Sequence, residues 1–102
     1  MAENEALARK ANERMAGWRE RDRGEALELY FCECASAECT EKVRLRTSDY
    51  ERVRSEPDRF IVALGHEASE IEKLLESHPG WAMVEKTAPE ARNVAEDTDP
   101  RA

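Results

Sequence analysis

The sequence predicts a small single α+β domain with a mainly antiparallel sheet, an N-terminal helix and a Cys₃His zinc site. Three observations lead to this prediction. Apolar residues recur at helical spacing near the N-terminus, they alternate with polar residues further along, and all three cysteines fall within eight residues. The chain has 102 residues, of which only 40% are hydrophobic. A core this small gains stability from a metal ion that ties its loops together.

The first segment, residues 1–24, is predicted to form an amphipathic helix that ends near Gly24. Its apolar side chains recur at spacings of four, four and three residues: Leu7, Ala11, Met15 and Trp18. Charged residues fill the remaining faces of this helix. The narrow apolar stripe suits packing on the rest of the domain, and it also suits pairing with a second copy of the chain or with another helix.

The second segment, residues 25–86, is predicted to be the zinc-stapled core, and it opens with two strands. From Ala26 to Cys34 the pattern has a period of two, so alternate side chains share a face. One face carries Leu27, Leu29 and Phe31, and the other carries Glu28, Tyr30, Cys32 and Cys34. In the following strand one face carries Val43 and Leu45, and the other carries Lys42, Arg44 and Arg46. A short loop that contains cysteine joins the two strands.

A helix is predicted after the second strand. Ser48 and Glu51 fit a capping box, in which each side chain binds the backbone N–H of the other residue. This helix must end before Pro57, because proline disfavours helical geometry in the residue that precedes it. Residues 60–64 then indicate a buried strand, since the run is apolar and partly β-branched.

The last part of the core is predicted to contain a helix and a strand. Residues 69–77 suggest a helix that buries Ile71, Leu74 and Leu75, and the following Pro-Gly ends it. Residues 81–86 indicate the final strand. The third segment, residues 87–102, is predicted to be a disordered acidic tail, because it has almost nothing apolar to bury.

The cysteines and one histidine form a candidate metal site. Cys32 and Cys34 share a face of an extended segment, and Cys39 can return across the loop. His66 follows the buried strand and lies beside Gly65, so its ring can reach the cysteine loop. Three soft sulfurs and one imidazole are the donors of a structural zinc site. His78 is the competing fourth ligand.

Three other interpretations of the cysteines remain open. They can be small buried core residues, with His66 a loop residue that plays no part in metal binding. A disulfide framework is disfavoured by the odd number of cysteines. A catalytic zinc needs an open position for water, and the sequence contains neither an H-E-x-x-H nor a deaminase signature.

Composition narrows the classes of partner. The net charge is −7 and the pI about 4.9, which makes binding to nucleic acid or to an anionic membrane unfavourable. The sequence contains no apolar run of membrane-spanning length and no signal-peptide pattern at its N-terminus, so we expect a cytoplasmic protein. Lys42, Arg44 and Arg46 form a basic ladder, either an ordinary solvent face or a docking surface for an acidic peptide or a phosphate backbone.

The chain resembles a group of small, uncharacterised bacterial proteins. The resemblance rests on Cys32-Glu33-Cys34, Cys39-Thr40-Glu41, Gly65-His66-Glu67 and Val84-Glu85-Lys86, with a charged helix before them. Ser48-Asp49 differs slightly from the usual entry to the middle helix of that group. The resemblance implies a shared fold and a shared metal site, with Cys32, Cys34, Cys39 and His66 at the matching positions, and it implies no activity.

These observations together favour a non-enzymatic zinc-binding protein that acts as an interaction or regulatory module. Its metal would be structural, and its partner would be an unidentified protein or a second copy of the chain. The alternative is a zinc-thiolate redox or metal sensor, in which oxidation of a cysteine releases the metal. A small metal-dependent hydrolase or deaminase comes third.

Overall fold

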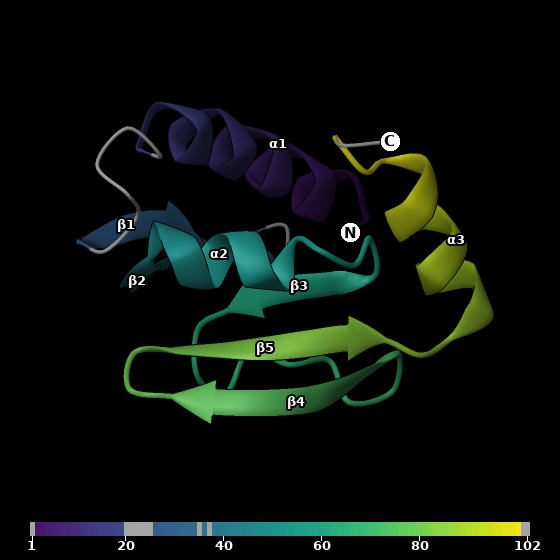
Figure 1. Cartoon of the computed structure of the whole chain (residues 1–102). Helices are drawn as coiled ribbons and strands as arrows, with labels where there is room; N and C mark the ends of the chain where they lie inside the picture. Colours follow the sequence, from purple (N-terminus) through teal and green to yellow (C-terminus); the bar gives the residue numbers. More distant parts are fainter. Residues whose placement is uncertain (1, 20–25, 35, 37, 101–102) are drawn as a thin grey trace.

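The computed structural model describes residues 2–19, 26–34, 36 and 38–100. It confirms the predicted α+β class, with an N-terminal helix and antiparallel sheets (Figure 1). In chain order its elements are α1 (Ala2–Arg19), β1 (Leu27–Phe31), β2 (Lys42–Arg46), α2 (Thr47–Val53), β3 (Arg59–Val62), β4 (Glu72–His78), β5 (Trp81–Lys86) and α3 (Pro89–Asp97). Within these residues, no helix is both long and apolar enough to cross a bilayer.

The strands form two antiparallel sheets. β1 and β2 make a hairpin, and the second sheet has the order β3-β5-β4, with β5 in the centre. The predicted strand at residues 81–86 is confirmed as β5, and nearly all of its side chains are buried because it has a strand on each side. The predicted strand at residues 60–64 corresponds to β3, one residue earlier at its start.

The first hairpin buries one aromatic side chain of β1 and both aliphatic side chains of β2 on the same face. Val43 and Leu45 of β2 are buried together with Tyr30 of β1, whose ring stacks on Tyr50 of α2 at 4.7 Å. The Tyr30 hydroxyl also lies 2.6 Å from the hydroxyl of Thr47. These contacts fix α2 against the hairpin, and they leave Leu27, Leu29 and Phe31 on the exposed side.

The prediction of a helix over residues 69–77 is wrong, because residues 69–71 form a turn and residues 72–78 form strand β4. His78 and Trp81 face each other across a two-residue turn, and Gly80 has the positive φ of 89° that such a turn needs. Pro79-Gly80 therefore closes a hairpin rather than ending a helix. A register shift between Leu74 and Glu76 breaks the alternation along β4, which explains why its apolar spacing resembled that of a helix.

The prediction of a disordered tail over residues 87–102 is also wrong for most of its length. Pro89 opens helix α3, which suits a residue that lacks a backbone N–H and has a helical φ. Ala95 on this helix is buried in a cluster with Phe60 of β3 and Val84 of β5. The tail therefore contributes to the core through one small side chain and through its backbone.

Helix α1 buries a polar face rather than the predicted apolar stripe. Leu7 is 67% exposed, and Ala11 and Met15 are only partly buried, while the side chain of Trp18 lies outside the described residues. The buried positions on this helix are Glu5, Arg9, Asn12 and Ala16, which recur at helical spacing. The helix packs on the domain through hydrogen bonds and ion pairs of the first three of these residues, while Ala16 joins an apolar cluster. The predicted boundary at residue 24 falls outside the described residues.

The entry to helix α2 also differs from the prediction. The helix begins at Thr47, its N-cap residue is Arg46, and no side chain caps it. The predicted capping box at Ser48 is therefore wrong. The hydroxyl of Thr47 lies against the hydroxyl of Tyr30 instead, and both residues are buried. This polar contact fixes the N-terminal end of α2.

Candidate metal centre

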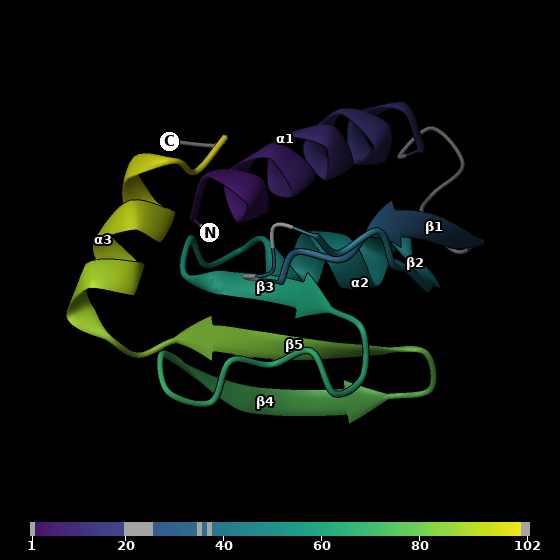
Figure 2. The same ribbon diagram turned by 180° about the vertical axis from the view of Figure 1, so that it is seen from behind.

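The first two cysteines lie on an extended segment that links the two sheets. Beyond the end of β1, the backbone N–H of Glu33 donates to the carbonyl of Ile61 in β3 at 2.8 Å. The Glu33 carboxylate returns to the N–H of Ile61 at 3.0 Å. Figure 2 shows this part of the chain passing along β3. Cys32 and Cys34, on either side of Glu33, are therefore held in a fixed position against the second sheet, and both are buried.

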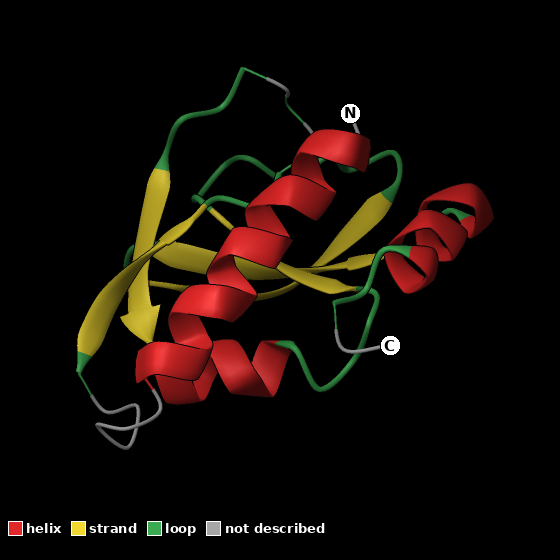
Figure 3. Ribbon diagram, turned by 90° about the horizontal axis from the view of Figure 1, so that it is seen from above, coloured by secondary structure: helices red, strands yellow, loops and turns green. Residues whose placement is uncertain are grey.

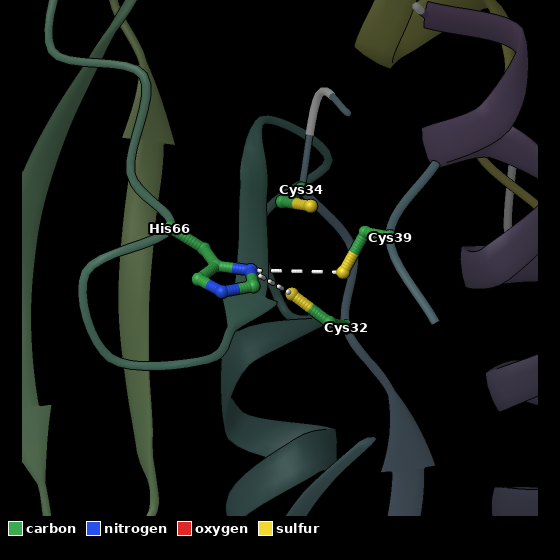
Figure 4. Close-up of side chains that lie close together, drawn as sticks. All are labelled: Cys32, Cys34, Cys39 and His66. Atoms are coloured by element: carbon green, nitrogen blue, oxygen red, sulfur yellow. Dashed lines mark hydrogen bonds between the residues drawn. The ribbon is translucent and has the colours of Figure 1, made fainter. Parts of the chain in front are cut away.

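The histidine comes from the turn that follows β3. The N–H of His66 donates to the carbonyl of Ala63 at 3.0 Å, which closes a four-residue turn. Gly65 is the third residue of that turn and has a φ of 83°, a conformation that disfavours any residue with a Cβ atom. This turn directs the imidazole toward the cysteines (Figure 4).

The third cysteine lies on the loop between β1 and β2. The N–H of Cys39 donates to the carbonyl of Ser36 at 3.3 Å, so the loop turns back before β2 begins. The N–H of Cys32 donates to the carbonyl of Glu41 at 3.1 Å, which holds the two ends of the loop together. Cys39 is partly buried, and it is the most accessible of the three cysteines.

The structure brings all four predicted site residues together. The ligand atoms of Cys32, Cys34, Cys39 and His66 all lie within 4.8 Å of one another. The Nδ1 atom of His66 is 3.6 Å from the sulfur of Cys32 and 3.6 Å from the sulfur of Cys39 (Figure 4). The three cysteines are free thiols rather than disulfides, so all three sulfurs are available as ligands.

These separations fit a tetrahedral metal site. With metal–sulfur and metal–nitrogen bonds of about 2.3 and 2.0 Å, a tetrahedron places sulfur and nitrogen roughly 3.5 Å apart. The two measured sulfur–nitrogen distances of 3.6 Å agree with that value. The donor atoms thus already stand close to the corners of a polyhedron that can enclose one metal ion.

The surroundings of the sulfurs also suit a bound cation. Burial raises the pKa of the Cys32 thiol strongly, and burial raises the pKa of Cys34 as well. A buried thiolate therefore needs a nearby positive charge, which a metal ion supplies. The N–H of Ala63 donates to the sulfur of Cys32 at 3.1 Å, and the backbone of Ser36 hydrogen-bonds to Cys34. Such donors around the ligands favour the thiolate form.

A buried carboxylate holds in place the segment that carries the first two cysteines. Glu33 is fully buried and accepts hydrogen bonds from the Asn12 amide at 2.8 Å and from the Tyr50 hydroxyl at 3.4 Å. Burial raises the pKa of Glu33 to about 7. Its contacts join α1, α2 and β3 to the segment between the first two cysteines. Glu33 and Asn12 cannot be recognised as supports from the sequence, because a charged residue and an amide are ordinary in a chain with 38% charged residues.

His78, the competing fourth ligand, is engaged elsewhere. Its ring stacks on Trp81 at a centroid distance of 4.5 Å, and its Nε2 lies 2.8 Å from the carboxylate of Glu76. Among the described residues, the group that can hold a metal contains His66 and not His78. The histidine that reaches the cysteines is therefore His66.

Comparison with protein-family models, with curated proteins and with solved structures gives no match for this chain. The resemblance to small bacterial proteins therefore stays an expectation from sequence. The candidate site is recognised from the convergence of its four side chains.

The three basic residues singled out in the sequence lie together on the surface. Lys42, Arg44 and Arg46 occupy alternate positions of β2, and all three are exposed, as the alternation predicts. They flank the cysteine loop, because Lys42 follows Glu41 directly in the chain. None of the three contributes to the candidate metal cluster.

Proposed function

We propose that the chain binds one zinc ion through Cys32, Cys34, Cys39 and His66, and that this ion is structural. The protein would then act as a non-enzymatic interaction or regulatory module. The observation that carries the proposal is the convergence of three sulfurs and one imidazole nitrogen within 4.8 Å. Two sulfur–nitrogen distances of 3.6 Å support it, since they match the edge of a tetrahedral site.

Zinc is the metal that this donor set favours. Three thiolates and an imidazole are soft to borderline ligands, which select zinc over magnesium or calcium. The tetrahedral arrangement is the usual geometry of structural zinc, whereas copper(II) and nickel(II) prefer square-planar sites. The ligand types and the site geometry therefore both favour zinc.

A structural role follows from which parts of the chain the ligands join. Cys32 and Cys34 follow β1, Cys39 lies on the loop to β2, and His66 follows β3. One bound ion would therefore connect the two sheets without the need for many apolar contacts between them. With four protein ligands no coordination position remains for a substrate or a water molecule, which supports a structural role over a hydrolase or deaminase.

Metal analysis of two histidine variants tests the proposal. Native mass spectrometry of the protein, purified under reducing conditions, should show one zinc per chain. His66→Ala should bind zinc more weakly, because it removes one of the four ligands. His78→Ala is the matched control, since this histidine stacks on Trp81 instead, and it should keep a full equivalent. Equal zinc content in both variants would contradict the assignment.

A second function, zinc-thiolate sensing, is favoured by the position of Cys39. This residue is only partly buried, and with Cys32 it lines a surface hollow of about 230 Å³. A small oxidant can therefore approach the sulfur from solvent. Oxidation of a ligand thiolate weakens its bond to the metal and can release the ion. Zinc release at low peroxide concentration, reversed by thiol reductant, would support sensing, and retention of zinc would refute it.

A further inference from the structure

We propose that the exposed face of the β1–β2 hairpin, with the adjoining side of α1, binds an acidic amphipathic segment of another protein. This proposal rests on the proposed function as an interaction module and names its docking surface. The surface, here called the hairpin face, consists of Leu27, Leu29 and Phe31 from β1, Lys42, Arg44 and Arg46 from β2, and Leu7, Ala11 and Met15 from α1. Figure 3 shows α1 running alongside the hairpin.

The apolar half of the hairpin face is exposed to solvent to an unusual degree. Leu27 is 61% exposed, Leu29 44% and Phe31 39%, and the three follow one another along the same side of β1. Leu7 of α1 adds a further exposed leucine. Side chains of this size are normally buried, and a row of them at the surface is typical of a binding site.

Two surface hollows lie beside this apolar row. One, of about 250 Å³, is lined by Met15, Leu29, Tyr30, Phe31 and Lys42. The other, of about 230 Å³, is lined by Leu7, Ala8, Ala11, Phe31, Cys32, Cys39 and Glu41. Phe31 lines both, so the hollows lie next to each other along the seam between α1 and β1. Each is large enough to accept a leucine or phenylalanine side chain of a partner.

The cationic half runs parallel to the apolar half. The register of the hairpin places Leu27 opposite Arg46, Leu29 opposite Arg44 and Phe31 opposite Lys42. Within the described ranges, none of these three cations forms an ion pair, although Lys42 lies 5.7 Å from the centre of the Phe31 ring. Arg52, Arg54 and Arg59 each pair with a carboxylate. The charge on the hairpin face is thus available to an anionic partner.

The structure also favours binding on the face over addition of a strand at the edge. The side-chain amide of Asn12 donates to the carbonyl of Phe31 at 2.9 Å and accepts from its N–H at 2.8 Å. This closes the free edge of β1 at Phe31, where a partner strand would need both groups. A helix that lays apolar side chains into the two hollows, with acidic residues toward β2, fits better.

Charge complementarity identifies the chemistry of the occupant. The whole chain has a net charge of −7, so a long polyanion such as nucleic acid meets repulsion outside this patch. A short acidic segment needs only the local cations, and its apolar residues fill the hollows. The candidate metal site lies at the end of this surface, since Cys32 and Cys39 line one hollow. A bound ion would hold that wall in place.

Binding of a synthetic peptide tests the proposal. The probe is a fluorescein-labelled helical peptide with leucines at i, i+4 and i+7, glutamates along one flank of the leucines and alanine elsewhere, and its control carries lysine in place of every glutamate. Fluorescence anisotropy on the full chain should show binding of the acidic probe, weaker at high salt, and no binding of the basic control. Arg44→Glu should weaken binding at least about tenfold, and Leu29→Ser should do so as well.

The second sheet offers matched control variants. Lys73→Glu changes an exposed cation on β4, and Leu74→Ser changes a leucine that is 46% exposed there, close to the 44% of Leu29. Both should leave affinity within about twofold of the parent chain. Equal effects of the control and test variants, or no binding at about 1 mM probe, would overturn the proposal.

Other occupants appear as distinct outcomes of the same experiment. If the chain dimerises in light scattering and Arg44→Glu abolishes the dimer, the face binds a second copy and the proposal is overturned. Binding to phosphatidylserine vesicles without binding to the probe would likewise overturn it. Zinc content is measured in every variant. If the parent chain carries a full equivalent of zinc but does not bind the probe, only the proposal for the hairpin face is refuted. If the chain carries no zinc, the metal proposal is refuted.

Discussion

Two regions of this protein hold distant parts of the chain together by different means. The cysteine–histidine cluster joins the segment after β1, the β1–β2 loop and the turn after β3 through four side chains that converge on one point. The inner face of α1 joins the helix to the domain through Glu5, Arg9 and Asn12, which are buried and polar. Neither region relies on the packing of large apolar side chains. The first has the donor set of a metal site, whereas the second consists entirely of protein groups.

The second region combines a group of buried paired charges with a buried guanidinium that binds backbone carbonyls. Lys86 lies 2.6 Å from both Glu5 and Glu72, and Arg9 donates to the carbonyl of Pro57 at 2.6 Å. Buried ion pairs of this kind contribute little net stability, yet removing one partner is costly. With a bound metal, as proposed, the cluster would be fragile in a different way, because its stability would depend on metal supply and on the oxidation state of its sulfurs. Substitutions in these regions and at an exposed ion pair outside them separate the two kinds of dependence.

The largest effect is expected from Cys34→Ser. Structural zinc in finger peptides contributes roughly 10–16 kcal/mol of apparent binding free energy, so loss of one thiolate can unfold a domain of this size. His66→Ala should cost less, because water can partly replace an imidazole on a turn. Thermal melts of both variants, with zinc content measured alongside, check this order. A melting temperature of Cys34→Ser equal to that of the parent chain would mean that the cysteines are ordinary core residues.

Replacement of a buried cation should have the next largest effect. Arg54 has a fully buried side chain that binds Glu13 of α1, Asp99 near the C-terminus and the carbonyl of Arg59. Arg54→Ala should lower the free energy of unfolding by about 3–5 kcal/mol, because the hub of a buried charge network is lost. Chemical denaturation measures this value. Zinc content should stay at one equivalent in the folded variant, and loss of zinc before unfolding would show that the two regions are coupled.

A smaller loss is expected where the two regions meet. Asn12→Ala removes three hydrogen bonds, two with the backbone of Phe31 and one with the carboxylate of Glu33. It should lower the free energy of unfolding by about 2–3 kcal/mol, since buried polar groups lose their partners. Lys10→Ala, an exposed position on the same helix, is the control and should change little. Equal destabilisation by both substitutions would argue against this role of Asn12.

The smallest effect concerns an exposed ion pair. Arg52 donates to Glu76 and lowers the pKa of that carboxyl to about 2, from a reference value of 4.5, with a further contribution from His78. The pair therefore adds stability above pH 4.5 and loses it as the pH falls through 2. Because the pair is exposed, we expect less than about 1 kcal/mol. The free energies of unfolding of Glu76→Gln and of the parent chain, measured by denaturation, should differ slightly at neutral pH. They should converge near pH 2, where Glu76 is protonated.

The cluster could be predicted from sequence because its residues are rare and chemically specific. The chain has three cysteines and two histidines, and the alternation of an extended segment places Cys32 and Cys34 on one side. The flexible Gly65 beside His66 correctly favoured that histidine over His78. The strand pattern of β2 also predicted which face of the hairpin carries the cations, because a period of two leaves only two choices.

The polar face of α1 could not be predicted by the same means. Glutamate, arginine and asparagine are usually exposed, and burial of a charge depends on partners far away in the sequence. Arg9 binds the carbonyl of Ala95, which lies in the stretch whose composition predicts a disordered tail. The strand β4 was missed because a register shift disturbs its period, although Pro79-Gly80 was a signal for a hairpin.

Zinc-edge X-ray absorption of the purified protein tests the metal assignment most directly, because it reports the identity and distance of the ligand atoms. We expect three sulfur atoms at about 2.3 Å and one nitrogen atom at about 2.0 Å, with no further light-atom ligand. Replacement of Cys34 by serine should remove one sulfur or abolish the zinc signal. A spectrum dominated by oxygen and nitrogen ligands, or a protein that folds unchanged without zinc in strong chelator, would contradict a closed structural site.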